Sequence, residues 1–137
     1  MIKCLQICDS LGFPFFNRIF GNFPEMDETL LAGLISAISS ISNQIFHQKL
    51  ATITFGEGKG KSNIVIVQKD FLQEKKSIYF VFFIQGECDM VLIKEVSTEI
   101  FIKLKNSFRN PTNIFNELKE KINFILDTRF HSLTVCL

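Results

Sequence analysis

The sequence contains no tryptophan, and only three prolines and seven glycines stand among its 137 residues. Together with 47% hydrophobic and 21% charged residues, this scarcity of chain breakers excludes a long disordered or low-complexity tract. A chain of this length fits one domain. Because tryptophan is missing, the sixteen phenylalanines must supply the largest side chains of its core.

A cluster of positive charge is also missing. The net charge is +1, and lysine and arginine are spread among the acidic residues, which excludes nucleic acid as the main partner. No uninterrupted apolar run approaches 18 residues, so we predict no transmembrane segment and only peripheral contact with a membrane. Lys3 alone precedes the first apolar stretch and no cleavage pattern follows, so we expect a cytoplasmic protein.

The sequence lacks the spacings of metal and redox sites. Four cysteines, at positions 4, 8, 88 and 136, match neither a zinc framework nor a C-x-x-C pair, and neither His47 nor His131 stands beside one at ligand spacing. We interpret the cysteines as reduced thiols. Asp9 is typical of a turn, Asp27 of a helix N-cap, and His47 of a helix C-terminus. We therefore expect no catalytic residue, no metal and no cofactor, and a protein that is not an enzyme.

The stretch TFGEGKGKS, residues 54–62, has the look of a phosphate-binding loop. Laying the P-loop pattern on Gly60-Lys61-Ser62 puts Phe55 where the first glycine belongs. The loop would also have to open a helix, but the β-branched run 63–67 follows and is typical of a strand. We interpret the segment as a flexible loop that joins two antiparallel strands.

Apolar periodicity predicts five strands and three helices. Strands are expected at Met1–Cys8, Phe13–Phe20, Leu50–Phe55, Asn63–Lys69 and Ser77–Gln85, and helices at Asp27–Phe46, Asp89–Ser107 and Pro111–Thr128. The last strand is apolar from Ile78 to Ile84, which predicts a central position with both faces covered. The predicted class is α+β, with a five-stranded antiparallel sheet in the order β-β-α-β-β-β-α-α and one helix on one face and two on the other.

This order, with the opening MIKCLQI, the turn LGFP at 11–14 and the helix start LLAGLISAI at 30–38, resembles a longin domain. Longins are profilin-like modules of vesicle-trafficking proteins. The resemblance covers residues 1–128 and leaves 129–137 as a tail. It implies a stand-alone longin, without a SNARE motif, that contacts small GTPases or tethering and trafficking partners at a membrane surface.

The first helix differs from an ordinary solvated helix. Its large apolar residues fill one arc of roughly 160°, which we expect to face the core. These residues are Leu30, Leu31, Leu34, Ile35, Ile38, Ile41, Ile45 and Phe46. No charged residue stands between Glu28 and Lys49, whereas a solvated face normally carries Lys and Glu.

Two interpretations of the outward face stay open. One is a serine-rich solvent face, and the other is a protein-interaction site where small side chains let a second backbone approach. The site residues would be Gly33, Ser36, Ala37, Ser40 and Asn43. The partner would be a second copy, forming a homodimer through this helix, or another protein laid along the helix and the strand Leu50–Phe55. An alternative function is a small-molecule-sensing α+β domain, because a sheet with helices can enclose a ligand pocket.

Overall fold

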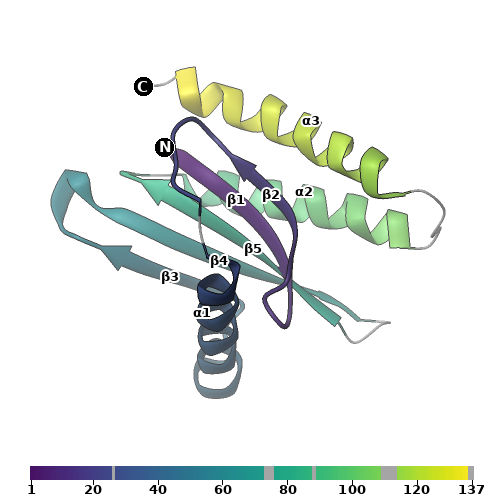
Figure 1. The fold of residues 1–137 in the computed structure, drawn as a ribbon, viewed down its shortest axis with the longest axis horizontal. Coiled ribbons are helices and arrows are strands. Elements are labelled where there is room, and N and C mark those ends of the chain that lie inside the picture. Colours follow the sequence, from purple (N-terminus) through teal and green to yellow (C-terminus); the bar gives the residue numbers. More distant parts are fainter. Residues whose placement is uncertain (26, 73–75, 88, 109–113, 136–137) are drawn as a thin grey trace. The chain divides into compact units, whose positions relative to one another are not determined.

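Five strands and three α-helices follow one another in the predicted order in the computed structural model, which describes residues 1–25, 27–72, 76–87, 89–108 and 114–135 (Figure 1). The chain divides into two units, Met1–Cys88 and Asp89–Leu137, and each is described by itself. The first contains β1 (Ile2–Asp9), β2 (Pro14–Ile19), α1 (Glu28–Ser40), the π-helical segment η1 (Ile41–Phe46), β3 (Leu50–Phe55), the 3-10 turn η2 (Gly58–Gly60), β4 (Ser62–Phe71) and β5 (Lys76–Gln85). The second contains α2 (Met90–Phe108) and α3 (Ile114–Val135). The α+β class is confirmed.

The strands of the first unit form one sheet in the order β2-β1-β5-β4-β3, and every neighbouring pair is antiparallel. β5 therefore lies in the middle, as its unbroken apolar run predicts. Each residue from Ile78 to Ile84 is buried, and Phe80, Val81 and Phe82 are fully inaccessible to solvent. The prediction of a central strand buried on both faces is confirmed.

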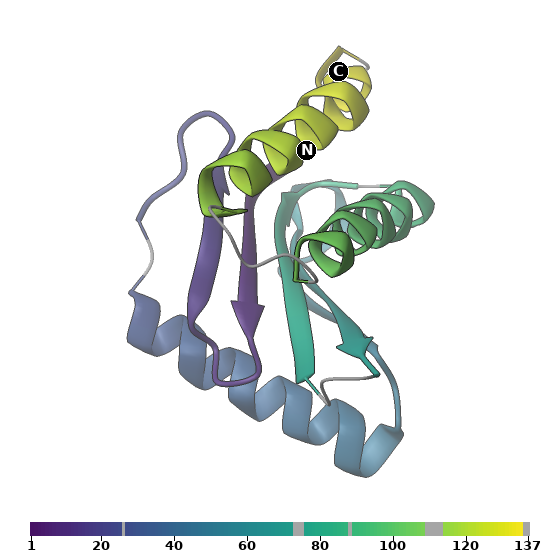
Figure 2. The ribbon, with the colours of Figure 1, turned by 90° about the vertical axis from the view of Figure 1, so that its right-hand side faces the viewer.

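α1 lies across one face of this sheet (Figures 1 and 2). Leu31 and Ile35, one turn apart on the helix, enter a buried cluster with side chains of the three inner strands. The sheet contributes Cys4, Cys8, Ile66, Tyr79, Val81 and Phe83 to this cluster. One helix on one face of the sheet thus agrees with the sequence prediction.

The glycine-rich segment joins β3 to β4, which pair antiparallel from Leu50 opposite Val67 to Phe55 opposite Ser62. Gly56 and Gly58 have φ values of 85° and 65°, which favour glycine. A strand follows the loop, so no helix N-terminus is available to face a phosphate group. The interpretation as a loop between antiparallel strands is confirmed.

In the second unit, α2 and α3 run side by side in opposite directions (Figure 1). Each helix has a buried apolar stripe, formed by Ile93, Val96, Ile100 and Leu104 on α2 and by Leu118, Ile122, Ile125, Leu126 and Phe130 on α3. Arg129 Nε donates to Glu99 Oε2 at 3.1 Å and joins the two helices at the surface. The exposed faces carry charged side chains together with Val91, Ile102 and Phe124, which are 51–71% exposed.

The end of α3 differs from the prediction. The helix continues past Thr128 to Val135, so residues 129–135, assigned to a tail, are helical. No glycine or proline follows Thr128, and Phe130 continues the buried stripe four residues after Leu126. The expected cap Asn110-Pro111 lies outside the described residues. A single domain over residues 1–128, and two helices on the second face of the sheet, stay predictions because they concern how the two units are placed.

Candidate functional site on the first helix

The start of α1 is fixed by a side-chain cap. Asp27 has extended backbone, and its Oδ1 accepts from the backbone N–H groups of Thr29 at 2.8 Å and Leu30 at 3.3 Å. These are two of the donors that the first turn of a helix leaves without an intrahelical partner. The N-cap predicted at Asp27 is therefore confirmed, and α1 begins at a defined residue.

The β1–β2 turn rests on α1. Asp9 Oδ1 accepts from the backbone N–H groups of Leu11 at 2.9 Å and Phe13 at 3.0 Å, which closes the turn. Gly12, with φ 84°, lies so close to the helix that a Cβ atom there would be 2.5 Å from the Ala32 Cα atom. The side chains beside it, Leu11 and Phe13, are 68% and 65% exposed. The turn thus lies directly against α1 (Figure 2).

The predicted site residues lie on the outer side of α1. Gly33, Ser36, Ala37 and Ser40 are exposed, and a Cβ atom added at Gly33 would meet nothing within 4 Å. Because residues four apart share a helix face, Gly33 lies beside Ala37 and Ser36 beside Ser40. The structure therefore brings four of the five residues together as a shallow, uncharged strip.

The fifth residue, Asn43, is half-buried within η1 rather than in a regular α-helix. Its side-chain amide donates to the backbone carbonyl of Ser39 at 2.8 Å. η1 ends at Phe46 and is capped by His47, which has left-handed backbone with φ 53° and donates its N–H to the Ser42 carbonyl. Asn43 therefore holds the helix backbone with its amide and contributes less free surface than expected.

The expectation that all eight large apolar residues face the core is wrong for four of them. Leu30, Ile45 and Phe46 are 65–70% exposed, and Ile41 is 42% exposed. Leu30 lies about 100° around the helix from the buried Leu31, at the edge of the apolar arc. A π-helical turn contains more residues than an α-helical turn, so η1 carries the side chains at 45 and 46 out of phase with the inner stripe.

The sequence does contain a signal for these exposed side chains, although helical periodicity alone does not show it. Eight large apolar residues are more than one helix needs to cover a sheet, and the polar residues Ser39, Ser40, Ser42 and Asn43 have weak helix propensity. Leu11 and Phe13 likewise stand out as large apolar residues on either side of a turn glycine. The exposed surface formed by Leu11, Phe13, Leu30, Gly33, Ser36, Ala37, Ser40, Ile41, Ile45 and Phe46 is called the α1 face below.

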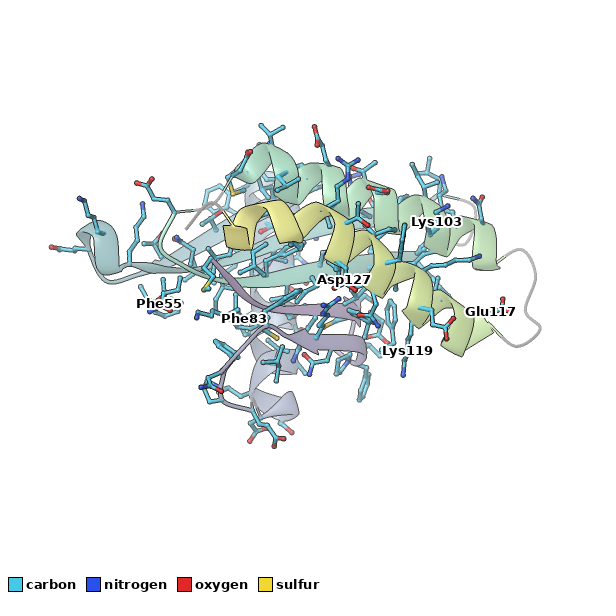
Figure 3. The ribbon with its side chains drawn as sticks, turned by 90° about the horizontal axis from the view of Figure 1, so that it is seen from above. Phe55, Phe83, Lys103, Glu117, Lys119 and Asp127 are labelled. Carbon is cyan, nitrogen blue, oxygen red and sulfur yellow. The ribbon has the colours of Figure 1, made fainter. Side chains whose placement is uncertain are left out.

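The α1 face differs from the described helices of the second unit in charge, although Val91, Ile102 and Phe124 are also exposed there. Figure 3 shows charged side chains along α2 and α3, and Lys103, Glu117, Lys119 and Asp127 are all exposed. Between Thr29 and Phe46, by contrast, no residue is charged. The difference is therefore local to α1 and is not a property of the whole chain.

One helix in the described part of the chain is long and apolar enough to cross a membrane by length and composition. It spans Thr29–Phe46, has a mean hydropathy of 1.4, and has only 11% of its residues buried. The sequence prediction of no transmembrane segment stays a prediction, because length and composition alone do not show that this helix crosses a membrane. Core helices pass the same test, and Leu31 and Ile35 of this one pack against the sheet.

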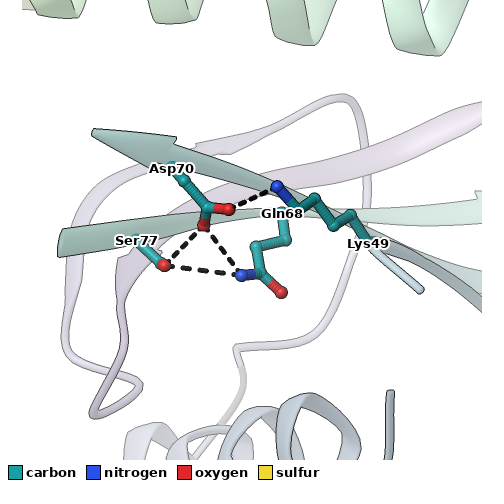
Figure 4. Close-up of polar contacts among 4 residues, drawn as sticks. All are labelled: Lys49, Gln68, Asp70 and Ser77. Carbon is teal, nitrogen blue, oxygen red and sulfur yellow. Dashed lines mark hydrogen bonds and ion pairs between the residues drawn. The ribbon is translucent and has the colours of Figure 1, made fainter. Parts of the chain in front are cut away.

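A polar network ties the strand that follows η1 to its neighbours (Figure 4). The Lys49 ammonium lies 2.6 Å from Asp70 Oδ2, while Ser77 and Gln68 donate to Asp70 Oδ1 at 2.6 and 2.8 Å. Burial acts to raise the pKa of Asp70, but these hydrogen bonds and the Lys49 charge outweigh it, so the pKa lies below its ordinary value. The network holds β3, β4 and β5 together where the helix returns to the sheet.

The thiols beneath α1 are not placed for catalysis. Burial raises the pKa of Cys4 to about 11, and burial together with the Asp9 charge raises that of Cys8 to about 12, so both are protonated at neutral pH. Within the described residues, no group of three or more His, Cys, Asp or Glu side chains could hold a metal ion. The α1 face itself offers contact surface and no reactive group.

No family model matches the sequence, and no curated protein matches it. Among solved structures, the chain is similar to the gliding protein MglB from Thermus thermophilus. The TM-score is 0.46 at 8% sequence identity, over 88% of this chain and 79% of that chain. A likeness of this degree carries no conclusion about family or function.

Proposed function

We propose that this chain is a non-enzymatic protein-interaction module of the longin type, which binds a protein partner through the α1 face. One observation carries the proposal. Large apolar side chains stand 42–70% exposed at Leu30, Ile41, Ile45 and Phe46, on a helix without a single charged side chain from Thr29 to Phe46. Single exposed apolar residues are ordinary, but a group of them without charged neighbours marks a binding surface.

The small residues between these side chains fit a helix or strand of the partner. Gly33, Ala37, Ser36 and Ser40 leave room for a second backbone close to α1, while Leu30 at one end and Phe46 at the other supply apolar anchors. Interfaces gain most of their affinity from a few such anchors, and the small residues provide shape complementarity.

The neighbouring strand extends this surface. β3 stands at the end of the sheet order, so its outer edge pairs with no other strand among the described residues. It begins only four residues after η1 ends, and Thr52, Thr54 and Phe55 along it are exposed. A partner laid along α1 and β3 could form backbone hydrogen bonds with this edge, a common mode of recognition.

The resemblance to longins supplies the class of partner: a small GTPase or a tethering or trafficking protein, met in the cytoplasm at a membrane surface. A second copy of the chain is the alternative occupant of the α1 face. Two backbones that approach over Gly33 and Ala37 would place the same residues on both sides of a two-fold axis.

Substitution of small residues tests the proposal. Ser36→Arg and Ala37→Glu place a long charged side chain on the α1 face, while the buried Leu31 and Ile35 keep the helix on the sheet. An unpaired charge in a buried contact costs several kcal/mol, and about 3 kcal/mol corresponds to a loss of affinity of more than 100-fold. We expect capture of the partner from cell extract to be lost in both variants, with unchanged circular dichroism and melting.

The matched control is Asn106→Arg, an added charge at an exposed position of α2. Capture in the presence of GDP or a non-hydrolysable GTP analogue identifies a GTPase by its nucleotide dependence. Light scattering of the purified chain detects a second copy, and flotation with phosphatidylcholine and phosphatidylserine vesicles tests the membrane. If the captured proteins, the oligomeric state and flotation are the same in the wild type and in both α1 variants, the face is only solvated surface.

A further inference from the structure

Large apolar side chains are exposed in two turns at one end of the sheet of the first unit. Leu11 and Phe13 of the β1–β2 turn are 68% and 65% exposed, and Leu72, directly after β4, is 84% exposed. Strand register places both turns at the same end, because Asp9 at the end of β1 pairs with Ile78 near the start of β5 (Figures 1 and 2). Leu11, Phe13 and Leu72 are called the turn tips below.

The turn tips are close enough to reach one surface together. Neighbouring strands of a sheet are about 4.8 Å apart, and β1 and β4 are the two neighbours of β5, so the ends of these strands are separated by roughly 10 Å. A single exposed apolar residue is ordinary, but turns normally carry small or polar residues, and none of the three side chains belongs to the buried core. Their grouping at one end of the sheet therefore marks a contact surface.

The carboxylates beside the turn tips are paired within the fold. Asp9 Oδ1 accepts from two backbone N–H groups of its own turn, and Asp70, near the end of β4, lies 2.6 Å from the Lys49 ammonium. Lys69 on β4 and Lys76 on β5 also stand close to this end of the sheet, and Lys76 is exposed. Three cations against two carboxylates leave a small excess of positive charge around the turn tips.

A lipid bilayer fits this arrangement better than a protein surface. The turn tips belong to two separate turns, so a protein partner would need a matching pocket for each, whereas acyl chains rearrange around any apolar side chain. Apolar residues of peripheral proteins enter the boundary between the headgroups and the acyl chains. Lysines beside them stay at the level of the headgroups, where anionic lipids attract them. The excess positive charge around the turn tips is complementary to such headgroups.

We propose that the turn tips dock the first unit onto the surface of a bilayer that contains anionic lipid. Leu11, Phe13 and Leu72 enter the boundary between headgroups and acyl chains, and Lys69 and Lys76 lie at the headgroups. This contact deepens the proposed function, on which it rests for the expectation of a membrane, by naming the part of the chain that meets the lipid. Because the β1–β2 turn lies against α1, a partner bound to α1 would be held beside the bilayer.

The chain has no tryptophan, so a single substitution gives a fluorophore at a chosen position. Phe13→Trp and Leu72→Trp place it at the turn tips. Two control variants place it at other positions that are more than half exposed: Phe55→Trp at the opposite end of the sheet, where β3 meets the start of β4, and Phe124→Trp on α3. Each variant is titrated with vesicles of phosphatidylcholine, with and without phosphatidylserine, prepared with and without brominated acyl chains.

We expect the emission of Phe13→Trp and Leu72→Trp to move to shorter wavelength on binding and to be quenched by the brominated acyl chains, because both positions enter the bilayer. Phosphatidylserine should strengthen the binding, and added salt should weaken it again. The emission of Phe55→Trp and Phe124→Trp should stay unchanged.

Leu72→Ser separates this contact from the α1 face, to which Leu72 does not belong. Loss of one leucine from the apolar contact should weaken vesicle binding about tenfold. Melting and capture of the protein partner should be unchanged, because the side chain is exposed and lies outside the α1 face. Ser36→Arg should give the opposite result, losing the partner and keeping the vesicles. Phe124→Ser is the matched control and should change neither, and Lys76→Gln should weaken binding only to vesicles with phosphatidylserine.

Three results would each overturn the proposal: no binding of the wild type to either kind of vesicle, equal quenching at the two control positions, or undiminished binding of Leu72→Ser. The turn tips would then be left to a protein partner or to solvent. If the wild type captures no protein but binds vesicles through Leu72, the proposed function fails and the lipid contact stands.

Discussion

The contact between the β1–β2 turn and α1 makes Gly12→Ala a quantitative test of the α1 face. The substitution has two costs. With φ 84°, Gly12 has a backbone that L residues rarely adopt, which costs about 1–2 kcal/mol. The new Cβ atom would also lie 2.5 Å from the Ala32 Cα atom and 2.9 Å from the Ala32 carbonyl oxygen. These are backbone atoms of the helix, so the turn or the helix must move.

Overpacking of this kind typically costs about 1–3 kcal/mol, so the two terms together predict a loss of about 2–5 kcal/mol in the free energy of unfolding. Alanine substitutions at two other glycines separate the cost of the backbone conformation from the cost of overpacking. Gly21 has φ 75° but nothing within 4 Å of an added Cβ atom, so Gly21→Ala should show only the backbone term. Gly33 has open space and ordinary helical backbone, so Gly33→Ala should stabilise the chain by up to about 1 kcal/mol.

The assay is urea unfolding of all four proteins, followed by far-ultraviolet circular dichroism. We expect the order of stability to be Gly33→Ala, wild type, Gly21→Ala and Gly12→Ala. Adding Ala32→Gly to Gly12→Ala removes the contact with the Ala32 Cβ atom at 2.8 Å, but glycine inside a helix itself costs about 1 kcal/mol, so the double variant should lose less than the two single variants together. If Gly12→Ala is no less stable than Gly21→Ala, the turn does not rest on the helix, and Leu11 and Phe13 do not belong to the α1 face.

Three further predictions concern the interior. Phe82→Ala and Phe83→Ala should each lower the free energy of unfolding by about 3–5 kcal/mol, because both rings are buried on the central strand; a loss below about 1 kcal/mol in either would mean that one face is open. The folded-state pKa of Asp70 is lowered, so its contribution to stability is present above the unfolded value of about 3.9 and is lost as the pH falls through the folded-state pKa. Asp70→Asn should therefore destabilise the chain near neutral pH and flatten the acid part of the stability profile, and an unchanged profile would contradict this. Burial raises the pKa of Cys4 and Cys8 from 9.0 to about 11 and about 12, so their contribution is complete below pH 9.0 and is lost as the pH rises through these values. In the native protein at neutral pH, Cys4 and Cys8 should react slowly with a thiol reagent, as peptide mapping of the labelled chain would show, and fast labelling of either without denaturant would contradict their burial.

Local patterns in the sequence were sufficient to predict the strands. Leu50–Phe55 has the predicted limits, and the unbroken apolar run of β5 placed it correctly in the middle of the sheet. The Asp27 cap was also predictable, because a carboxylate before an apolar periodic stretch has few other roles. In each case residues close in the sequence determine the structure.

The surface of α1 could not be predicted in the same way. A constant 100° per residue put Ile41, Ile45 and Phe46 on the core side, but the π-helical turn changes the phase of the helix and is not marked by any single residue. The buried Gln6 Oε1 atom, which has no hydrogen-bond partner among the described residues, is beyond local patterns for another reason. Its surroundings depend on Asn17 and Val81 being opposite Gln6, and both follow from strand register.

Substitutions at the small residues Ser36 and Ala37 test the α1 face most clearly, because they change neither η1 nor the buried cluster beneath the helix. Replacement of Ile45 or Phe46 changes apolar surface within η1, so a loss of binding there could arise from a change in the π-helical turn as well as from a lost contact. Ser36 and Ala37 lie within the regular part of α1, are exposed, and are outside the cluster formed by Leu31 and Ile35. Arginine and glutamate are good helix formers, so the helix should lose at most some tenths of a kcal/mol by carrying them. Any loss of association in Ser36→Arg or Ala37→Glu therefore measures what approaches the helix from outside.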